Sequence, residues 1–326
     1  MRYQYVLLRK YAALLKRVSA LVVVLLFAVT AARGQYDVSF SHYFDMEPSF
    51  NPAAVGKGQL VNITAAYAMD LAGFEHNPNT MYVAADMPFY FLNMYHGGGV
   101  SIMSDKIGLF AHQRVALQYA LKRDLLGGVL SVGAQLGFLS EKFNGSGVEV
   151  VDDPTDPVFS SGDLTGSAFD LGAGLYYSHG SWYVGASVQH ATAPLVELGE
   201  RNELKIDQTY YLTGGYNIKL RNPFLSIPTS FLVRSDAVAY RADVTARLVY
   251  TTEKKRMYVG ASYSPTNSVT VLIGGRFHGI HVGYSYEVYT SAINPGNGSH
   301  ELFVGYQTDL NLTKKGKNKH KSVRYL

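Results

Sequence analysis

The stretch that decides the fold is residues 299–310, Ser299-His300-Glu301-Leu302-Phe303-Val304-Gly305-Tyr306-Gln307-Thr308-Asp309-Leu310, in which apolar and polar residues alternate. A dozen or more segments upstream repeat this pattern. Segments of roughly ten residues with a period of two, separated by turn residues, are typical of a transmembrane antiparallel β-barrel. The sequence therefore predicts a protein that moves or holds something at a membrane.

The clearest predicted strand runs from Tyr240 to Tyr250, and its two faces differ in character. The apolar face has a tyrosine at each end and consists of Tyr240, Ala242, Val244, Ala246, Leu248 and Tyr250. The polar face consists of Arg241, Asp243, Thr245 and Arg247. The first face suits lipid and the second suits a wet lumen. A register shift by one residue would move both arginines into lipid, at a cost of roughly a few kcal/mol each.

We count about 14 such strands within a barrel predicted over residues 59–312, and an even number is usual for bacterial barrels. They are centred near residues 64, 83, 100, 115, 133, 172, 185, 213, 232, 245, 260, 272, 285 and 305. With both termini in the periplasm, the longest connections, about 141–165 and 191–206, lie outside. Most periplasmic connections are then short, such as Lys122–Asp124, His179–Ser181 and His278–Gly279. The connection from Pro88 to Tyr95 is long and aromatic, which makes it an exception.

The N-terminus has the character of an export signal over residues 1–34. A basic region is followed by an apolar run from about Val18 to Ala32 and then by Ala32-Arg33-Gly34. Small residues at the first and third positions before a cut predict cleavage between Gly34 and Gln35. The alternative is a retained anchor, but the apolar run is short for a spanning helix. An export signal and a barrel pattern together predict the bacterial outer membrane.

The amino-acid composition excludes several kinds of site and partner. The chain has no cysteine, so disulfides, lipoprotein anchoring and thiolate metal sites are excluded. Its 25 tyrosines suit the aromatic girdles of a barrel, although a soluble β-protein remains a distant alternative. Twelve Lys and Arg residues lie in the signal and the C-terminal tail. Removing them from the net charge of +4 leaves about −8 for the body, which argues against a nucleic-acid binder.

Residues 35–58 precede the first strand and are predicted to form a periplasmic N-terminal segment. It contains Phe40-Ser41-His42-Tyr43-Phe44 and an Asn-Pro box, Asn51-Pro52-Ala53-Ala54-Val55-Gly56. Asn-Pro initiates turns, and the aromatic residues ahead of it suit a plug or brace at the periplasmic mouth. An ordered lead-in without a partner is the other interpretation. We take Phe50, Asn51 and Pro52 as candidates for partner binding.

With these motifs the sequence resembles the PorP/SprF family of type IX secretion outer-membrane proteins. The resemblance also rests on Gly99-Val100, on Asp105-Lys106-Ile107-Gly108, on Ser299-His300-Glu301 and on the closing Ser322-Val323-Arg324-Tyr325-Leu326. It covers essentially the whole mature chain. The chain departs from the family pattern at Asp45-Met46-Glu47, where an Asn-Pro is common, and this puts the branch in doubt.

The resemblance implies a non-enzymatic role at the outer membrane. One branch belongs to the core machine that exports proteins with C-terminal sorting domains, and it is associated with a periplasmic ring and a peptidoglycan-binding partner. The other branch helps to secrete or anchor particular adhesins, including those used in gliding motility. From another class, a FadL-like channel for hydrophobic or small solutes is the alternative. That reading needs an open or gated lumen.

Charged residues on the polar strand faces are predicted to face the lumen, where they either line a channel or brace a closed one. The resemblance favours bracing. The set consists of Arg114, Arg234, Asp236, Arg241, Asp243, Arg247, Arg276 and Glu287.

Residues 313–326 form a basic tail that we predict to project into the periplasm. The tail's candidates for partner binding are Lys314, Lys315, Lys317, Lys319, Lys321, Arg324 and Tyr325. The tail is either a solvated end or a docking peptide for an acidic periplasmic partner or the cell-wall matrix. The Tyr325-Leu326 end favours docking, because solvation alone needs neither residue.

Motifs for catalysis and metal binding are missing from the sequence. It has no Gly-x-Ser-x-Gly elbow, His-Glu-x-x-His helix or phosphate-binding loop. His300 and Glu301 lie on a strand and therefore face opposite sides. Acidic residues from Asp152 to Asp163 offer oxygen ligands for Ca²⁺, but their spacing is not that of an EF-hand, and solvated acids are the default. We therefore predict no enzyme activity, no metal and no cofactor.

Overall fold

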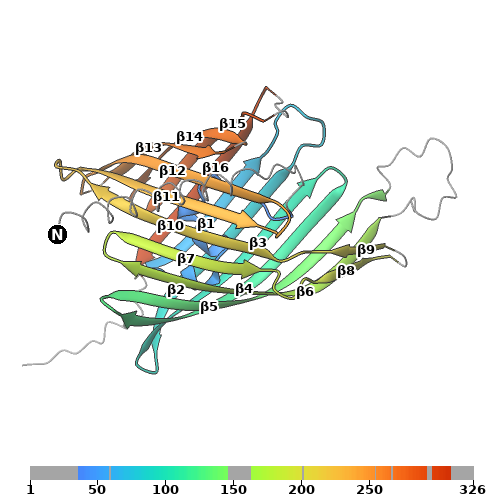
Figure 1. The fold of residues 1–326 in the computed structure, drawn as a ribbon, viewed down its shortest axis with the longest axis horizontal. Coiled ribbons are helices and arrows are strands. Elements are labelled where there is room, and N and C mark those ends of the chain that lie inside the picture. Colours follow the sequence, from blue (N-terminus) through green and yellow to red (C-terminus); the bar gives the residue numbers. More distant parts are fainter. Residues whose placement is uncertain are drawn as a thin grey trace, which may run out of the picture.

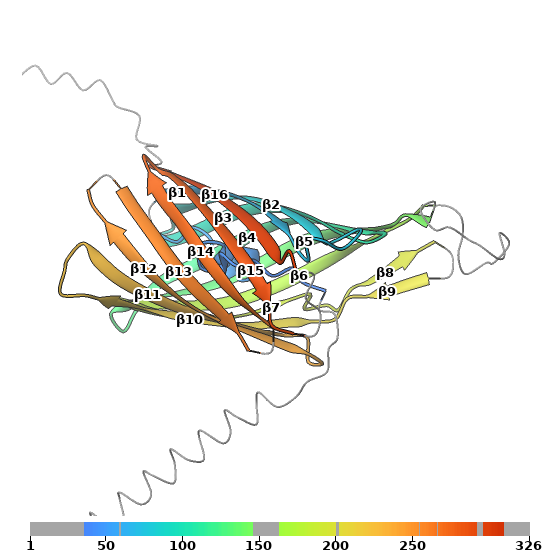
Figure 2. The same ribbon diagram turned by 90° about the horizontal axis from the view of Figure 1, so that it is seen from above.

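The computed structural model describes residues 36–58, 60–145, 163–199, 202–253, 255–265, 267–291 and 296–309. Fourteen antiparallel strands close into a barrel (Figures 1 and 2), in which each strand pairs with the next along the chain and β1 pairs with β16. The barrel strands are β1 (Leu60–Met69), β2 (Asn79–Phe91), β3 (Met94–Ile107), β4 (Phe110–Leu125), β5 (Gly128–Phe143), β6 (Leu164–His179), β7 (Trp182–Gln189), β10 (Thr209–Lys219), β11 (Leu225–Ser235), β12 (Tyr240–Thr251), β13 (Lys255–Ser264), β14 (Ser268–Phe277), β15 (Ile280–Tyr289) and β16 (Ser299–Asp309). All fourteen predicted strand centres fall within these strands, so the predicted fold class is confirmed.

The barrel has two unlike ends, which we name by their connections. The turn end carries Leu92–Asn93, Leu126–Gly127 and Gly180–Ser181, together with the start of β1 and the end of β16. The loop end carries the connections 70–78, 144–163 and 190–208. Two predicted turn-end connections were wrong, because most of Pro88–Tyr95 and all of Lys122–Asp124 belong to strands that run on to two-residue turns.

The predicted alternation of faces holds on β12. Val244, Leu248 and Tyr250 are exposed on the outside of the barrel, whereas Asp243 and Thr245 are buried inside. The outward apolar surface is the surface that lipid covers in a barrel of this kind. No helix among the described residues has the length and apolar character needed to cross a membrane.

Strand lengths differ around the barrel. β4, β5 and β6 have 16 residues each, whereas β7 has eight and β13, β14 and β15 have ten each. A further hairpin, β8 (Leu195–Leu198) and β9 (Asn202–Lys205), forms a separate two-stranded sheet at the loop end. The sequence reading treated this region as a plain loop, because four-residue strands carry too few positions for a period of two to be recognised.

The lumen contains the N-terminal segment. Residues 36–58 form three short 3-10 helices inside the barrel, η1 (Tyr43–Asp45), η2 (Glu47–Ser49) and η3 (Pro52–Ala54), seen in blue within the strands of Figure 2. Their aromatic residues pack against inward-facing side chains of the wall, for example Phe40 against Tyr82. The segment therefore occupies the lumen as a plug, which is one of the two predicted interpretations, and only its assignment to the periplasm outside the barrel is corrected. We call residues 36–58 the lumen segment.

Several predicted features lie beyond the part of the chain that the structure describes. They are the signal with its cleavage site at Gly34 and Gln35, the tail of residues 313–326 with its lysines, Arg324 and Tyr325, and the acidic loop residues Asp152, Asp153 and Asp156. Asp163 is described, and its carboxylate pairs with Lys142 at 2.8 Å.

Candidate functional site

The lumen segment is shaped by its prolines and its Asn-Pro box. Pro48 and Pro52 lie in the first turns of η2 and η3, where their fixed φ favours the helical turn and their missing N–H has no helical partner to lose. Asn51 caps η3, because its Oδ1 accepts a hydrogen bond from Ala53 N at 2.9 Å. Local sequence therefore produces the compact turn that the box predicts.

The same box is bound to the wall of the barrel by direct hydrogen bonds. Asn51 Nδ2 donates to the Leu175 carbonyl at 3.0 Å, and Ser131 Oγ donates to the Ala53 carbonyl at 2.6 Å. Glycine allows this approach, because a Cβ on Gly133 would lie 2.3 Å from Ala53 N and a Cβ on Gly174 would lie 2.1 Å from Asn51 Oδ1. The box is thus an internal anchor.

The candidates for partner binding in this segment are buried. The ring of Phe50 stacks on Tyr211 at 5.5 Å, and its carbonyl accepts hydrogen bonds from Ser187 Oγ and Gln189 Nε2, both at 2.8 Å. Asn51 and Pro52 are buried with it. The prediction that Phe50, Asn51 and Pro52 bind a periplasmic partner is therefore corrected, since the closed barrel leaves no surface of theirs open.

Glu301 holds the other side of the segment. Its carboxylate accepts hydrogen bonds from Ser41 N at 2.6 Å and His42 N at 3.0 Å, and it lies 2.6 Å from His42 Nδ1. His300, its neighbour on β16, points outward to the Tyr284 hydroxyl at 2.7 Å, as the alternation predicts. The two N-terminal and C-terminal motifs, some 260 residues apart, thus meet in one buried hydrogen-bonded cluster.

Asp37 is a third point of attachment, in the loop-end half of the barrel. Its carboxylate accepts a hydrogen bond from the Tyr211 hydroxyl at 2.7 Å and lies 3.1 Å from His190 Nε2. Arg234, which is predicted to face the lumen, donates to the Asp37 carbonyl at 2.8 Å. Arg114 from the same predicted set approaches the Asp37 carboxylate to 4.0 Å. The two buried arginines therefore brace the segment.

The charges in this cluster shift one another's ionisation. Burial lowers the pKa of His190, but Asp37 and Asp170 on either side raise it more, so that it reaches about 9. Burial raises the pKa of Asp37, but His190 and Arg114 lower it more, so that it falls well below its usual range. At neutral pH the pair is therefore ionised, and it joins the lumen segment to the wall by a buried salt bridge.

A fourth attachment involves η1 and the predicted lumen residue Arg247. Its guanidinium lies 3.5 Å from the centre of the Phe44 ring and 3.9 Å from the Asp45 carboxylate. His281 approaches the same carboxylate to 3.8 Å. An aromatic face and a carboxylate on one cation are a favourable combination when water is excluded.

The remaining predicted lumen charges mostly brace the wall. Arg241 pairs with Asp243 at 3.1 Å and with Glu287 at 2.9 Å, which ties β12 to β15 inside the barrel. Arg276 is exposed towards the turn end and donates to Gln307 at 2.6 Å. The prediction for Asp236 is corrected, because it lies in the turn after β11 and accepts hydrogen bonds from backbone N–H groups of that turn.

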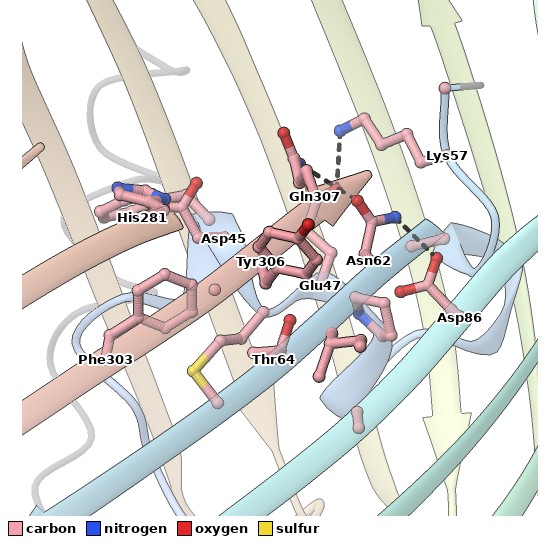
Figure 3. A pocket seen from close by; sticks show the side chains of 18 of the residues that line it. Asp45, Glu47, Lys57, Asn62, Thr64, Asp86, His281, Phe303, Tyr306 and Gln307 are labelled. Atoms are coloured by element: carbon pink, nitrogen blue, oxygen red, sulfur yellow. Dashed lines mark hydrogen bonds and ion pairs between the residues drawn. The ribbon is translucent and has the colours of Figure 1, made fainter. Parts of the chain in front are cut away.

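A cavity of about 300 Å³ remains between the lumen segment and the wall formed by β1, β2 and β16 (Figure 3). Several of its polar groups bond to one another. Lys57 donates to Glu47 at 2.7 Å, Asn62 donates to Asp86 at 2.9 Å, and Gln307 donates to Asn62 at 3.1 Å. Among the described residues no group of three or more His, Asp or Glu side chains is placed to hold a metal ion.

Sequence reasoning missed the carboxylates and histidines that attach the lumen segment. It assigned no role to Asp37, to His190 or to Glu141, which accepts a hydrogen bond from the Tyr36 hydroxyl. The motif around His42 and the one around Glu301 were noted separately, but nothing in one sequence pairs them. Only closure of the barrel brings residues so distant in the chain together.

These features define a class, a transmembrane β-barrel whose lumen is filled by its own N-terminal segment. The chain belongs to the family of type IX secretion system membrane proteins PorP/SprF, whose model matches residues 32–306. Barrel fold and family together place the protein in the bacterial outer membrane. No functionally curated protein matches the chain.

Solved outer-membrane barrels resemble it only distantly. A FadL homologue from Pseudomonas aeruginosa is 11% identical over 79% of this chain and 92% of that one, with a TM-score of 0.47. BamA from Haemophilus ducreyi lacking POTRA domains 1–3 is 10% identical over 76% and 70%, with a TM-score of 0.41. Omp33 from Acinetobacter baumannii is 10% identical over 78% and 99%, also with a TM-score of 0.41. Likenesses at this level say nothing about function.

Proposed function

We propose that this protein is a non-enzymatic, closed platform of the type IX secretion system. The turn end faces the periplasm and the loop end faces the cell exterior, because short turns and longer loops have this arrangement in outer-membrane barrels. The observation that carries the proposal is the lumen segment. It is held on different sides of the barrel by Glu301, His190 and the glycine surface at Gly133 and Gly174.

A filled lumen favours a platform over a conducting channel. The attachments are buried, and each would leave polar groups without partners if the segment withdrew. Single-channel recording in planar bilayers tests this. The full protein should be nearly silent, and a steady conductance of porin size would contradict the proposal and support the alternative of a FadL-like or small-solute channel.

The partners we propose are periplasmic components of the secretion system, including a peptidoglycan-binding protein, and exported proteins with C-terminal sorting domains. The basic tail is the proposed periplasmic contact, because its lysines and its Tyr325-Leu326 end suit an acidic partner surface. Replacing its five lysines with glutamine should weaken co-purification of periplasmic partners and leave the barrel folded. Unchanged co-purification and secretion would remove the tail from the proposal.

Deletion of the gene separates the two branches of the family. Culture supernatant and cell surface would be assayed for all proteins with C-terminal sorting domains. Loss of the whole set would place this chain in the secretion core, whereas loss of one adhesin would make it a dedicated anchor. If export were wholly normal, the platform proposal would fail.

A further inference from the structure

Strand β6 extends past its neighbour at the loop end. It pairs with β5 along its whole length, from Leu164 to Ser178. Its other neighbour, β7, pairs with it only between Ala173 and His179. Residues 164–170 of β6 therefore form a sheet edge with which no described residue pairs.

No described residue pairs with this edge because the chain after β7 turns inward. His190 and Ala193 have positive φ angles of 53° and 45°, which divert the chain from the ladder. β8 then crosses the inner face of β6, where a Cβ on Gly166 would lie 2.2 Å from the Glu197 carbonyl oxygen. The β8–β9 hairpin thus covers the face of the extension and does not itself pair with the edge.

The direction of the free backbone groups follows from the last hydrogen bond of the ladder. The Leu171 carbonyl accepts from Ala191 N at 2.8 Å on the β7 side. Since a strand repeats every two residues, Thr165, Ser167 and Phe169 present both N–H and C=O to the same side. A row of alternating donors and acceptors at strand spacing is the chemistry that binds an extended polypeptide.

We propose that residues 164–170 of β6 bind an extended segment of an exported polypeptide by β-strand addition. This inference rests on the proposed function, which places the loop end outside the cell. Phe169 would be the anchor, because its side chain is 72% exposed and lies edge-on to Phe138 at 5.7 Å. An aromatic or β-branched residue opposite Phe169, and small polar residues opposite Ser167 and Thr165, would fit this edge.

A second copy of the chain does not fit the edge. Strands of such barrels tilt by about 35–45° from the membrane normal. Two copies that pair the same edge through a twofold rotation about that normal would have their β6 strands crossing at about 70–90°, which prevents a ladder. A polypeptide that is not embedded in the membrane has no such restriction.

The charge of the neighbouring hairpin favours a basic segment at this edge. Glu197 and Glu203 lie directly opposite each other on β8 and β9, both are exposed, and no ion pair joins either to a described residue. Two like charges in this arrangement repel each other, so a positive group nearby relieves them. The segment that binds β6 is therefore expected to carry lysine or arginine.

A proline substitution tests whether the backbone N–H groups of this edge bind the exported polypeptide. Ser167→Pro removes an N–H from the open side and leaves the hydrogen bonds to β5 intact, and edge strands tolerate proline. The matched control is Ser167→Ala, which keeps the backbone. Heat-modifiable migration on gels checks that both barrels fold. We expect at least a tenfold loss of cargo at the cell surface for Ser167→Pro and normal levels for Ser167→Ala.

Photo-crosslinking identifies what binds at this edge and leaves the backbone of β6 unchanged. p-Benzoylphenylalanine replaces Ser167, or Gln113 on the outer face of β4 as a control, and adducts are identified by mass spectrometry in secreting cells. An adduct at 167 with an exported protein that bears a sorting domain supports the proposal. Adducts only with residues 146–162 of the same chain, or only with a second copy, overturn it, and so does normal export by Ser167→Pro. If gene deletion also leaves export normal, it is the proposed function that has failed.

Discussion

Replacing Glu301 with alanine should release the lumen segment. The side chain is 4% exposed, and its carboxylate holds Ser41 N, His42 N and the His42 ring at 2.6 to 3.0 Å. Hydrogen bonds to a charged group contribute about 1.5–3 kcal/mol each. Because the three share one acceptor group and are not additive, we take the lower end, about 4 kcal/mol for the set.

Hydrogen exchange measured by mass spectrometry detects this release at amides that do not contact Glu301. Amides of residues 47–58 do not bond to Glu301; the Asn51 amide bonds to the Glu47 carbonyl at 2.9 Å, and the Gly56 amide bonds to Asp86 at 2.7 Å. If the lumen segment leaves as one unit, about 4 kcal/mol corresponds to exchange roughly 1,000-fold faster. Planar-bilayer conductance should rise in the same variant.

The control is His300→Ala, which removes the outward-facing neighbour of Glu301 and should leave exchange in residues 47–58 unchanged. Folding of both variants is checked by heat-modifiable migration. Less than tenfold faster exchange in a folded Glu301→Ala barrel would refute the reasoning, because it would mean that the segment is held piecewise or that the hydrogen bonds to Glu301 add little to its attachment.

Three other changes probe the same attachment. Gly133→Ala places a methyl group 2.3 Å from Ala53 N, so exchange in residues 47–58 should rise at least tenfold. His190 has a folded pKa of about 9, above its ordinary 6.5, so its contribution is complete below pH 6.5 and is lost as the pH rises through 9. That loss, at most about 3 kcal/mol, should appear as weaker protection of these amides at pH 10 than at pH 6, once the intrinsic base-catalysed rise of exchange with pH has been divided out. Arg247→Met removes the cation over Phe44 and should cost about 1–2 kcal/mol in thermal unfolding.

Each of these has its own control. Gly98→Ala meets only the edge of the Phe89 ring at 3.3 Å, so it should be tolerated where Gly133→Ala is not. His190→Asn should remove most of the pH dependence of this protection between pH 6 and pH 10, and a variant that keeps it would show that another group is responsible. For Arg247, Arg247→Lys keeps the charge, and equal stability of the lysine and methionine variants would contradict the role of the cation.

The barrel could be predicted from the sequence because its cause is local. On β12 an apolar side chain recurs at every second residue between Tyr240 and Tyr250, and lipid outside with polar groups inside permits only one register for such a strand. The Asn-Pro box is equally local, since the Asn51 cap and Pro52 act within one turn. Fourteen strands and a compact N-terminal turn therefore follow from residues that are neighbours in the chain.

The place of the lumen segment was decided by the tertiary structure alone. The contact of His42 with Glu301 spans some 260 residues, and that of Asp37 with His190 spans 153, so neither leaves a periodic trace in one sequence. The stretch of β6 with which no described residue pairs has the same origin, because the chain bends at His190 and β7 stops short. Alternation determines which way a side chain points, but only closure of the barrel determines what it meets there.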